Sequence, residues 1–204
     1  MRLYHHPLSS NARRAVMTAL HLDTPLELTV VDLGKGEQRA PEFLRMNPNG
    51  RVPVLEDDGF ILTESHAIMQ YLADKTPGQI VYPEDLRARA DVNRWLFWSA
   101  HHFQPAVSVL AWEHFIKPMI GRGATDPKEV KRGEDLVTEC GRVLDAHLAG
   151  KRWVAGENLT LADFALASPL MMQEHAKLPI TEYGNLREWF KRVRELPAWK
   201  QTSG

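Results

Sequence analysis

The sequence has little cysteine and no long apolar run. Cys140 is the only cysteine among 204 residues, so the chain can form neither an internal disulfide nor a Cys-x-x-Cys redox pair. Such sparse use of cysteine fits a reducing compartment. Met1 is followed within a few residues by histidines, proline and serines instead of the apolar core of a secretory signal, and no later stretch approaches membrane-spanning length. We therefore expect a cytoplasmic protein with no membrane partner.

An excess of either charge is also lacking. The 25 Lys and Arg residues nearly balance the 26 Asp and Glu residues, which leaves a formal net charge of -1. A nucleic-acid-binding protein or one that acts on polyanions usually carries a strong basic field. The composition therefore gives no reason to expect a nucleic-acid partner and leaves small, modestly charged ligands as candidates.

Metal-binding motifs are missing as well. His5 and His6 are adjacent on a predicted strand, where neighbouring side chains point to opposite sides. His101 and His102 are adjacent on a predicted helix and lie about 100° apart around its axis. No HExxH pattern and no HxxxH pair is present. We predict no metal site.

What is present in the first third of the chain is an alternation of strand and helix signals. Apolar alternation predicts strands, and apolar residues at helical spacing predict helices. The predicted strands are 2–5, 26–32, "VPVLED" and "FILT", and the predicted helices are 12–22, a short one starting at Pro41, and 64–74. The order β-α-β-α-β-β-α predicts a small mixed α/β domain.

The pattern changes from about Thr76. The segment "TPGQIVYPED" has the proline and glycine content of a linker, and no convincing strand follows it. Helical stretches are predicted over 86–117, 127–149, 161–177 and 186–196. Pro105 and Pro169 fall inside two of them, so we expect kinks or breaks there. In "NLTLADF", Thr160 and Asp163 have the spacing of a helix capping box.

Two serines precede the first predicted helix, in "YHHPLSSNARRAV". The N-terminus of a helix carries unpaired N–H groups and a partial positive charge, so Ser9 or Ser10 can cap the helix, and an anion can also bind there. No GxSxG turn is present, which argues against a serine hydrolase. Capping and anion binding both stay open on these residues alone.

Two later stretches have related properties. In "NPNGRVPVLEDDG", Pro53 stands directly before a strand, where a cis bond would leave the backbone N–H and C=O of Val52 free to pair with an extended ligand. In "LTESHAI", Glu64 and Ser65 begin another predicted helix and can receive an anionic group.

Taken together in this order, these stretches resemble the cytosolic glutathione S-transferases, and most of all their serine-type theta, delta and phi classes. The similarity runs from the serine turn and "RRAV" through "NPNGRVPVL" and "LTESHAIMQYLAD" to "LTLADF" and "LPAWK". It implies a thioredoxin-like, glutathione-binding α/β domain over residues 1–76, a linker over 77–86, and an all-helical domain over 87–204 that contributes the pocket for the electrophile. It also implies a homodimer.

The resemblance also implies roles for individual residues. Ser10, four residues before Arg14, matches the serine that activates the thiol of glutathione, with Ser9 as the alternative and Asn11 as an auxiliary donor. The positions that match glutathione-binding residues are Gln38, Arg39, Arg51, Val52, Pro53, Glu64 and Ser65. Many relatives have His and Lys where this chain has Gln38 and Arg39, so the arginine keeps the charge and the glutamine changes one contact.

The function implied is conjugation of glutathione, as co-substrate and without a metal, to hydrophobic electrophilic small molecules. Aromatic residues of "WLFWSAHHFQPAVSVLAWEHF" are candidates for the electrophile pocket, although a stripe of aromatics at helical spacing also suits a core. The candidates are Trp98, His102, Phe103, Trp112 and Phe115. The alternative is a binding or interaction protein that uses the same fold with negligible turnover.

Overall fold

The computed structural model describes residues 1–202 and divides the chain into two compact units. The first unit is Met1–Tyr82 together with the C-terminal segment that begins at Pro197, and the second is Pro83–Leu196. Within the described residues, no helix is long and apolar enough to cross a bilayer.

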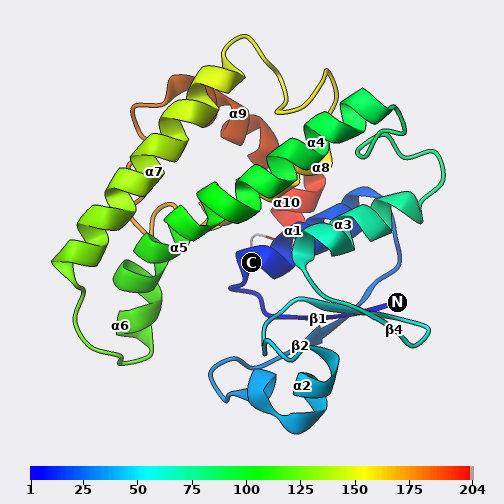
Figure 1. Cartoon of the computed structure of the whole chain (residues 1–204), viewed down its shortest axis with the longest axis horizontal. Helices are drawn as coiled ribbons and strands as arrows, with labels where there is room; N and C mark the ends of the chain where they lie inside the picture. Colours follow the sequence, from blue (N-terminus) through cyan, green and yellow to red (C-terminus); the bar gives the residue numbers. More distant parts are fainter. Residues whose placement is uncertain (203–204) are drawn as a thin grey trace. The chain divides into compact units, whose positions relative to one another are not determined.

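The first unit is built on a four-stranded sheet in the order β2-β1-β3-β4. Its strands are β1 (Arg2–His5), β2 (Glu27–Val30), β3 (Val54–Asp57) and β4 (Phe60–Leu62). β1 pairs parallel to β2 and antiparallel to β3, and β3 pairs antiparallel to β4 (Figure 1). This is the predicted thioredoxin-like arrangement of mixed strands.

Helices cover both faces of the sheet because successive strand residues point to opposite sides. Leu3 and Leu55 pack with apolar residues of α1 (Ser10–His21) and α3 (Ser65–Asp74). On the other face, Val54 packs with Phe43 of α2 (Pro41–Met46), which follows the short 3-10 helix η1 (Glu37–Arg39) (Figure 1).

The last helix of the chain, α10 (Pro197–Gln201), belongs to the first unit. Trp199 is buried, and the guanidinium of Arg13 in α1 lies 3.8 Å from the centre of its ring. Arg13 also donates to Thr202 Oγ1 at 3.1 Å and to the Trp199 carbonyl at 3.2 Å. The segment that begins at Pro197 was expected within a helical domain over 87–204. It belongs instead to the first unit, because these contacts hold it against α1.

The second unit contains helices joined by loops, and no strand among its described residues. Its segments are α4 (Leu86–Trp98), the π-helix η2 (Ser99–Phe103), α5 (Gln104–Ala111), the π-helix η3 (Trp112–Ile116), α6 (Lys117–Met119), α7 (Pro127–Leu148), α8 (Leu161–Ala167), the 3-10 helix η4 (Ser168–Met172) and α9 (Gly184–Arg194). The irregularity expected near Pro105 is present as the π-helix η2, which ends at Phe103. α5 begins at the next residue and has Pro105 in its first turn, where a proline is tolerated.

The helix predicted over 161–177 is shorter than expected. α8 ends at Ala167, and Pro169 lies in η4, whose tighter winding ends at Met172. A proline cannot donate the hydrogen bond that continues an α-helix, which accounts for the change of winding. The capping box of Thr160 and Asp163 is confirmed at the start of α8, where the Thr160 N–H donates to the carboxylate of Asp163 at 2.9 Å.

Candidate functional site

The paired serines lie at the start of α1, and the structure gives them different positions. Ser9 is the N-cap: its Oγ accepts from the Ala12 N–H at 3.2 Å, and its carbonyl accepts from the Arg13 N–H at 2.9 Å. Ser10 is the first residue of the helix, and both serines are half-buried. The cap of α1 is therefore Ser9, and Ser10 and Asn11 are the first two residues of the helix.

The electrostatics of this turn favour an anion. The first turn of α1 contains no acidic residue, so the partial positive charge of the helix N-terminus is not offset within the turn. A serine hydroxyl has one proton to donate and two lone pairs, so Ser9 can accept its capping bond and still donate. Either serine therefore has the chemistry to donate a hydrogen bond to an anionic sulfur.

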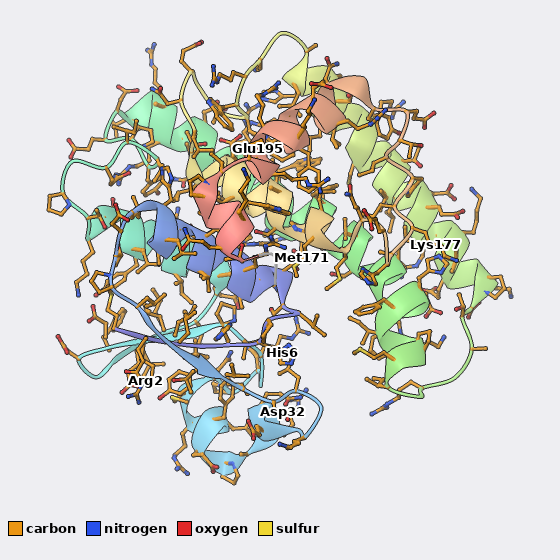
Figure 2. All side chains as sticks on the ribbon, turned by 180° about the vertical axis from the view of Figure 1, so that it is seen from behind. Arg2, His6, Asp32, Met171, Lys177 and Glu195 are labelled. Atoms are coloured by element: carbon orange, nitrogen blue, oxygen red, sulfur yellow. The ribbon has the colours of Figure 1, made fainter. Side chains whose placement is uncertain are left out.

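The adjacent histidines of this stretch, His5 and His6, are both partly buried. His6, which follows β1 and is labelled in Figure 2, accepts at Nδ1 from the Leu8 N–H at 3.2 Å. Burial, together with the neighbouring His6, lowers the pKa of His5 below its usual value. Among residues 1–202, no three His, Cys, Asp or Glu side chains gather in a way that would hold a metal ion.

The strand register brings three segments to one end of the sheet. β1 is antiparallel to β3, and Tyr4 pairs with Val54, so the serine turn after β1 and the Val52–Pro53 segment before β3 leave the sheet at the same end. Leu62 pairs with Leu55, so the chain that leaves β4 toward α3 reaches that end too. The segments that carry Ser10, Val52 and Glu64 therefore converge, although they are far apart in the sequence.

The Val52–Pro53 peptide bond is cis. The Val52 side chain is buried against Phe43 and Val54. Within residues 1–202, no other backbone group forms a hydrogen bond with the N–H or C=O of Val52. This backbone is therefore available to pair with an extended ligand.

Asn47 organises the turn that leads into this segment, a role that the sequence patterns did not reveal. Its buried side chain donates from Nδ2 to the Arg51 carbonyl at 2.7 Å and accepts at Oδ1 from the Asn49 N–H at 3.1 Å. The Gly50 N–H donates to the Asn47 carbonyl at 2.9 Å. One amide thus fixes the backbone directly before the cis bond.

Arg39 lies against the same turn. Gly50 has a φ of 58°, and a Cβ atom at Gly50 would stand 2.7 Å from Arg39 Nη1 and 2.9 Å from the Gln38 carbonyl. Glycine is therefore required both by the left-handed backbone and by this close approach. Gln38 donates from Nε2 to the Leu33 carbonyl at 3.5 Å, whereas Arg39 and Arg51 are exposed. Arg39 beside Gly50 and Arg51 next in the chain thus place two cationic side chains at the turn before the cis bond.

The start of α3 has unusual backbone geometry. Glu64, the exposed N-cap residue, has φ 68° and ψ 110°, a region that residues other than glycine rarely adopt. Such conformations cluster at ligand-binding and active sites. Ser65, buried, begins the helix, so its backbone N–H and hydroxyl stand at the positive end of the α3 dipole.

Each of the two units is similar in sequence to a domain of known proteins. A family model described as "Glutathione S-transferase, N-terminal domain" matches residues 1–74, and one described as "Glutathione S-transferase, C-terminal domain" matches residues 101–197. The chain belongs to the glutathione S-transferase family. Glutathione S-transferase F10 of Arabidopsis thaliana is 32% identical to this family member over 97% of this chain and 94% of the relative. Glutathione S-transferase theta-2 of Rattus norvegicus is 34% identical, over 98% and 79%.

Solved structures of glutathione S-transferases have the same fold. A delta-class enzyme of Nilaparvata lugens has 32% sequence identity and a TM-score of 0.83, and the alignment covers 98% of this chain and 92% of that one. Glutathione S-transferase-I, solved with the ligand lactoylglutathione, has 27% identity and a TM-score of 0.88, with coverages of 99% and 97%.

A buried arginine links α1 to α3 in this glutathione S-transferase. Arg14 has no exposed surface, and its Nη1 lies 2.8 Å from Nε2 of His66, the second residue of α3. Burial lowers the pKa of Arg14 to about 9. This value is still above neutral pH, so the guanidinium stays protonated. The sequence patterns used Arg14 only to count to Ser10, and they gave His66 no role.

The candidates for the electrophile pocket follow one another along a single helical stretch of the second unit, from α4 to η3. Trp98 ends α4, His102 and Phe103 are in η2, and Trp112 and Phe115 are in η3. Phe103 has no exposed surface and stacks on Trp98 with a centroid distance of 5.9 Å, so it is a core residue. The other four retain some exposure, and Phe115 packs against the ring of His175 at 4.7 Å.

Proposed function

We propose that this chain is a glutathione transferase that holds glutathione as a thiolate at Ser10 and transfers it to hydrophobic electrophiles. The observation that carries the proposal is the convergence of the serine turn, the Val52 backbone and the Glu64–Ser65 turn at one end of the thioredoxin-like sheet. The names of the relatives and the conjugate in one structural neighbour support the reaction class.

The magnitude of the required pKa shift is within reach of one hydroxyl. A free thiol has a pKa of about 8.5, and only the thiolate is a strong nucleophile. Lowering that pKa by about 2 units needs about 2.7 kcal/mol of differential stabilisation. A hydrogen bond to a charged group contributes about 1.5 to 3 kcal/mol, and a helix N-terminus adds up to about 1 kcal/mol. Ser10 at the start of α1 supplies both, and it acts as a donor, not as the nucleophile.

The remaining groups would hold the rest of the tripeptide. Glu64 and Ser65 would bind its γ-glutamyl end, and the backbone of Val52 would pair with the cysteinyl backbone. Arg39 and Arg51 would bind the glycyl carboxylate. The amide nitrogen of Gln38 already points to the Leu33 carbonyl, so we assign the charge contact to the arginines and only a neighbouring role to Gln38.

The electrophile would meet aromatic side chains of the helical unit. Trp98, His102, Trp112 and Phe115 present rings with exposed surface, and such rings favour apolar and aromatic ligands. We also propose a homodimer and a cytoplasmic location, both typical of the family. Sedimentation would then give about twice the 23.2 kDa mass of one chain.

Retention on immobilised glutathione, followed by ultraviolet absorbance of the bound thiol, tests the proposal. A transferase should be retained and should show thiolate absorbance near neutral pH. Retention without thiolate would favour a binding protein that uses this fold, and failure to be retained would remove glutathione from the account.

A further inference from the structure

The bond between Arg14 and His66 joins the two helix ends that the proposed function uses. Arg14 lies four residues after Ser10 and therefore on the same face of α1. Long side chains in helices lean toward the N-terminus, which directs the Arg14 guanidinium toward the turn of Ser10. His66 follows Ser65 directly. The 2.8 Å contact thus connects the serine turn of α1 with the γ-glutamyl turn of α3.

The chemistry of the two groups fixes how the bond is made. A guanidinium has only donors, so Nε2 of His66 must accept, and the proton of the neutral ring must be on Nδ1. A bond from a charged donor is stronger and more directional than one between neutral groups. Since Arg14 is fully buried, removing the imidazole would take this acceptor from a charged donor in a place that water does not reach.

We propose that Arg14 and His66 are positioning residues, which set the spacing between the Ser10 hydroxyl and the Glu64–Ser65 turn so that one glutathione molecule reaches both. This inference rests on the proposed function. The bond also gives the strained turn at Glu64 a fixed neighbour: the backbone there has φ 68°, and His66 anchors the chain two residues later.

The neighbouring arginine provides a matched control. Arg13 is also buried in α1, and its partners include Thr202 and Trp199. Replacing Arg13 removes a buried guanidinium from the same helix without touching His66. A general loss of stability in α1 would therefore appear in both variants, whereas a loss of positioning would appear only when the Arg14–His66 bond is broken.

Three variants of the full-length protein test the proposal: His66→Leu, which removes the acceptor, His66→Gln, whose Oε1 can replace Nε2 as acceptor, and Arg13→Leu. Glutathione affinity by calorimetry and the pKa of the bound thiol by ultraviolet titration are measured on each protein below its melting temperature. We expect His66→Leu to weaken glutathione binding about tenfold and to raise the thiol pKa, because the Ser10 turn and the Glu64–Ser65 turn would lose their fixed spacing. His66→Gln and Arg13→Leu should stay within about twofold of the parent. The first variant keeps an acceptor for Arg14, and the second leaves the Arg14–His66 bond in place.

The proposal is overturned if His66→Leu binds glutathione like the parent with the same thiol pKa, if His66→Gln is as impaired as His66→Leu, or if Arg13→Leu shifts the thiol equally. A parent protein that does not bind glutathione would instead defeat the proposed function, and with it this inference. The two failures are therefore distinguishable.

Discussion

At the scale of single residues, the two serines of α1 divide the tasks that the sequence left open. Ser9 caps the helix, which leaves Ser10 in the first turn as the proposed donor. The resemblance supplied this register through Arg14, but no pattern in the chain could show which hydroxyl caps, because that depends on where the helix begins. The φ of Glu64 and the contact of Arg14 with His66 were likewise not predictable, since both are consequences of tertiary packing.

Ser65→Ala should separate binding from activation. The hydroxyl at the start of α3 is proposed to hold the γ-glutamyl end, so its loss should weaken glutathione binding about tenfold, as expected for one hydrogen bond to a charged group. The thiol pKa should change little, because Ser10 is untouched. Calorimetry and ultraviolet titration check the two quantities, with exposed Ser108→Ala as a control. Parental affinity in Ser65→Ala would contradict the γ-glutamyl assignment.

At the scale of elements, the strands and the first-domain helices follow from the sequence within a few residues. The alternation of Leu3 and Tyr4 between the two faces, and the apolar spacing on α1 and α3, determine them locally. The long helices of the second unit were less predictable. Prolines indicated where irregularity would occur, but the winding that results, π in η2 and 3-10 in η4, depends on what packs against each segment.

Asp163, the N3 residue of the α8 capping box, is a buried carboxylate with several donors. Asp163 accepts from the Thr160 and Val154 N–H groups, each at 2.9 Å, and from Trp189 Nε1 at 2.8 Å. Asp163→Asn cannot accept at both positions and turns a donor toward one N–H group. We expect it to lower the free energy of unfolding by about 2 to 4 kcal/mol at neutral pH, measured by denaturant titration. A change below about 0.5 kcal/mol would contradict this role.

The same substitution has a predictable pH dependence. Burial raises the pKa of Asp163 from 3.8 to about 6, so between these values the folded state binds a proton that the unfolded state releases. The contribution of this carboxyl to stability is therefore full below about pH 4 and falls as the pH rises to about 6. The stability difference between the parent and Asp163→Asn should accordingly shrink over that window. A difference that grows with pH would show that the pKa is lowered instead.

At the scale of the whole molecule, the matched family domains leave the last helix outside the first match, yet the fold assigns α10 to the first unit. The sequence could not reveal this return, because "LPAWK" reads as a continuation of the helical domain. The contacts of Trp199 with Arg13 explain it, and they make the C-terminal segment part of the stability of the α/β unit.

Trp199→Ala should therefore destabilise the protein by about 3 to 5 kcal/mol, the usual cost of removing a large buried aromatic side chain. The melting temperature should fall accordingly in calorimetry. Phe97→Ala is the matched control, since Phe97 is 65% exposed and its removal should cost little. Equal effects of the two substitutions would contradict the assignment of α10 to the folded α/β unit.

The central claim is that Ser10 donates a hydrogen bond to the sulfur of glutathione, and the pKa of the bound thiol tests it most directly. Ultraviolet titration of the glutathione complex should give a thiol pKa about 2 units below 8.5 in the parent. In Ser10→Ala that pKa should return most of the way to 8.5, while glutathione affinity stays nearly unchanged. A shift caused by Ser9→Ala and not by Ser10→Ala would move the donor to Ser9, and an unshifted thiol in the parent would contradict activation by either serine.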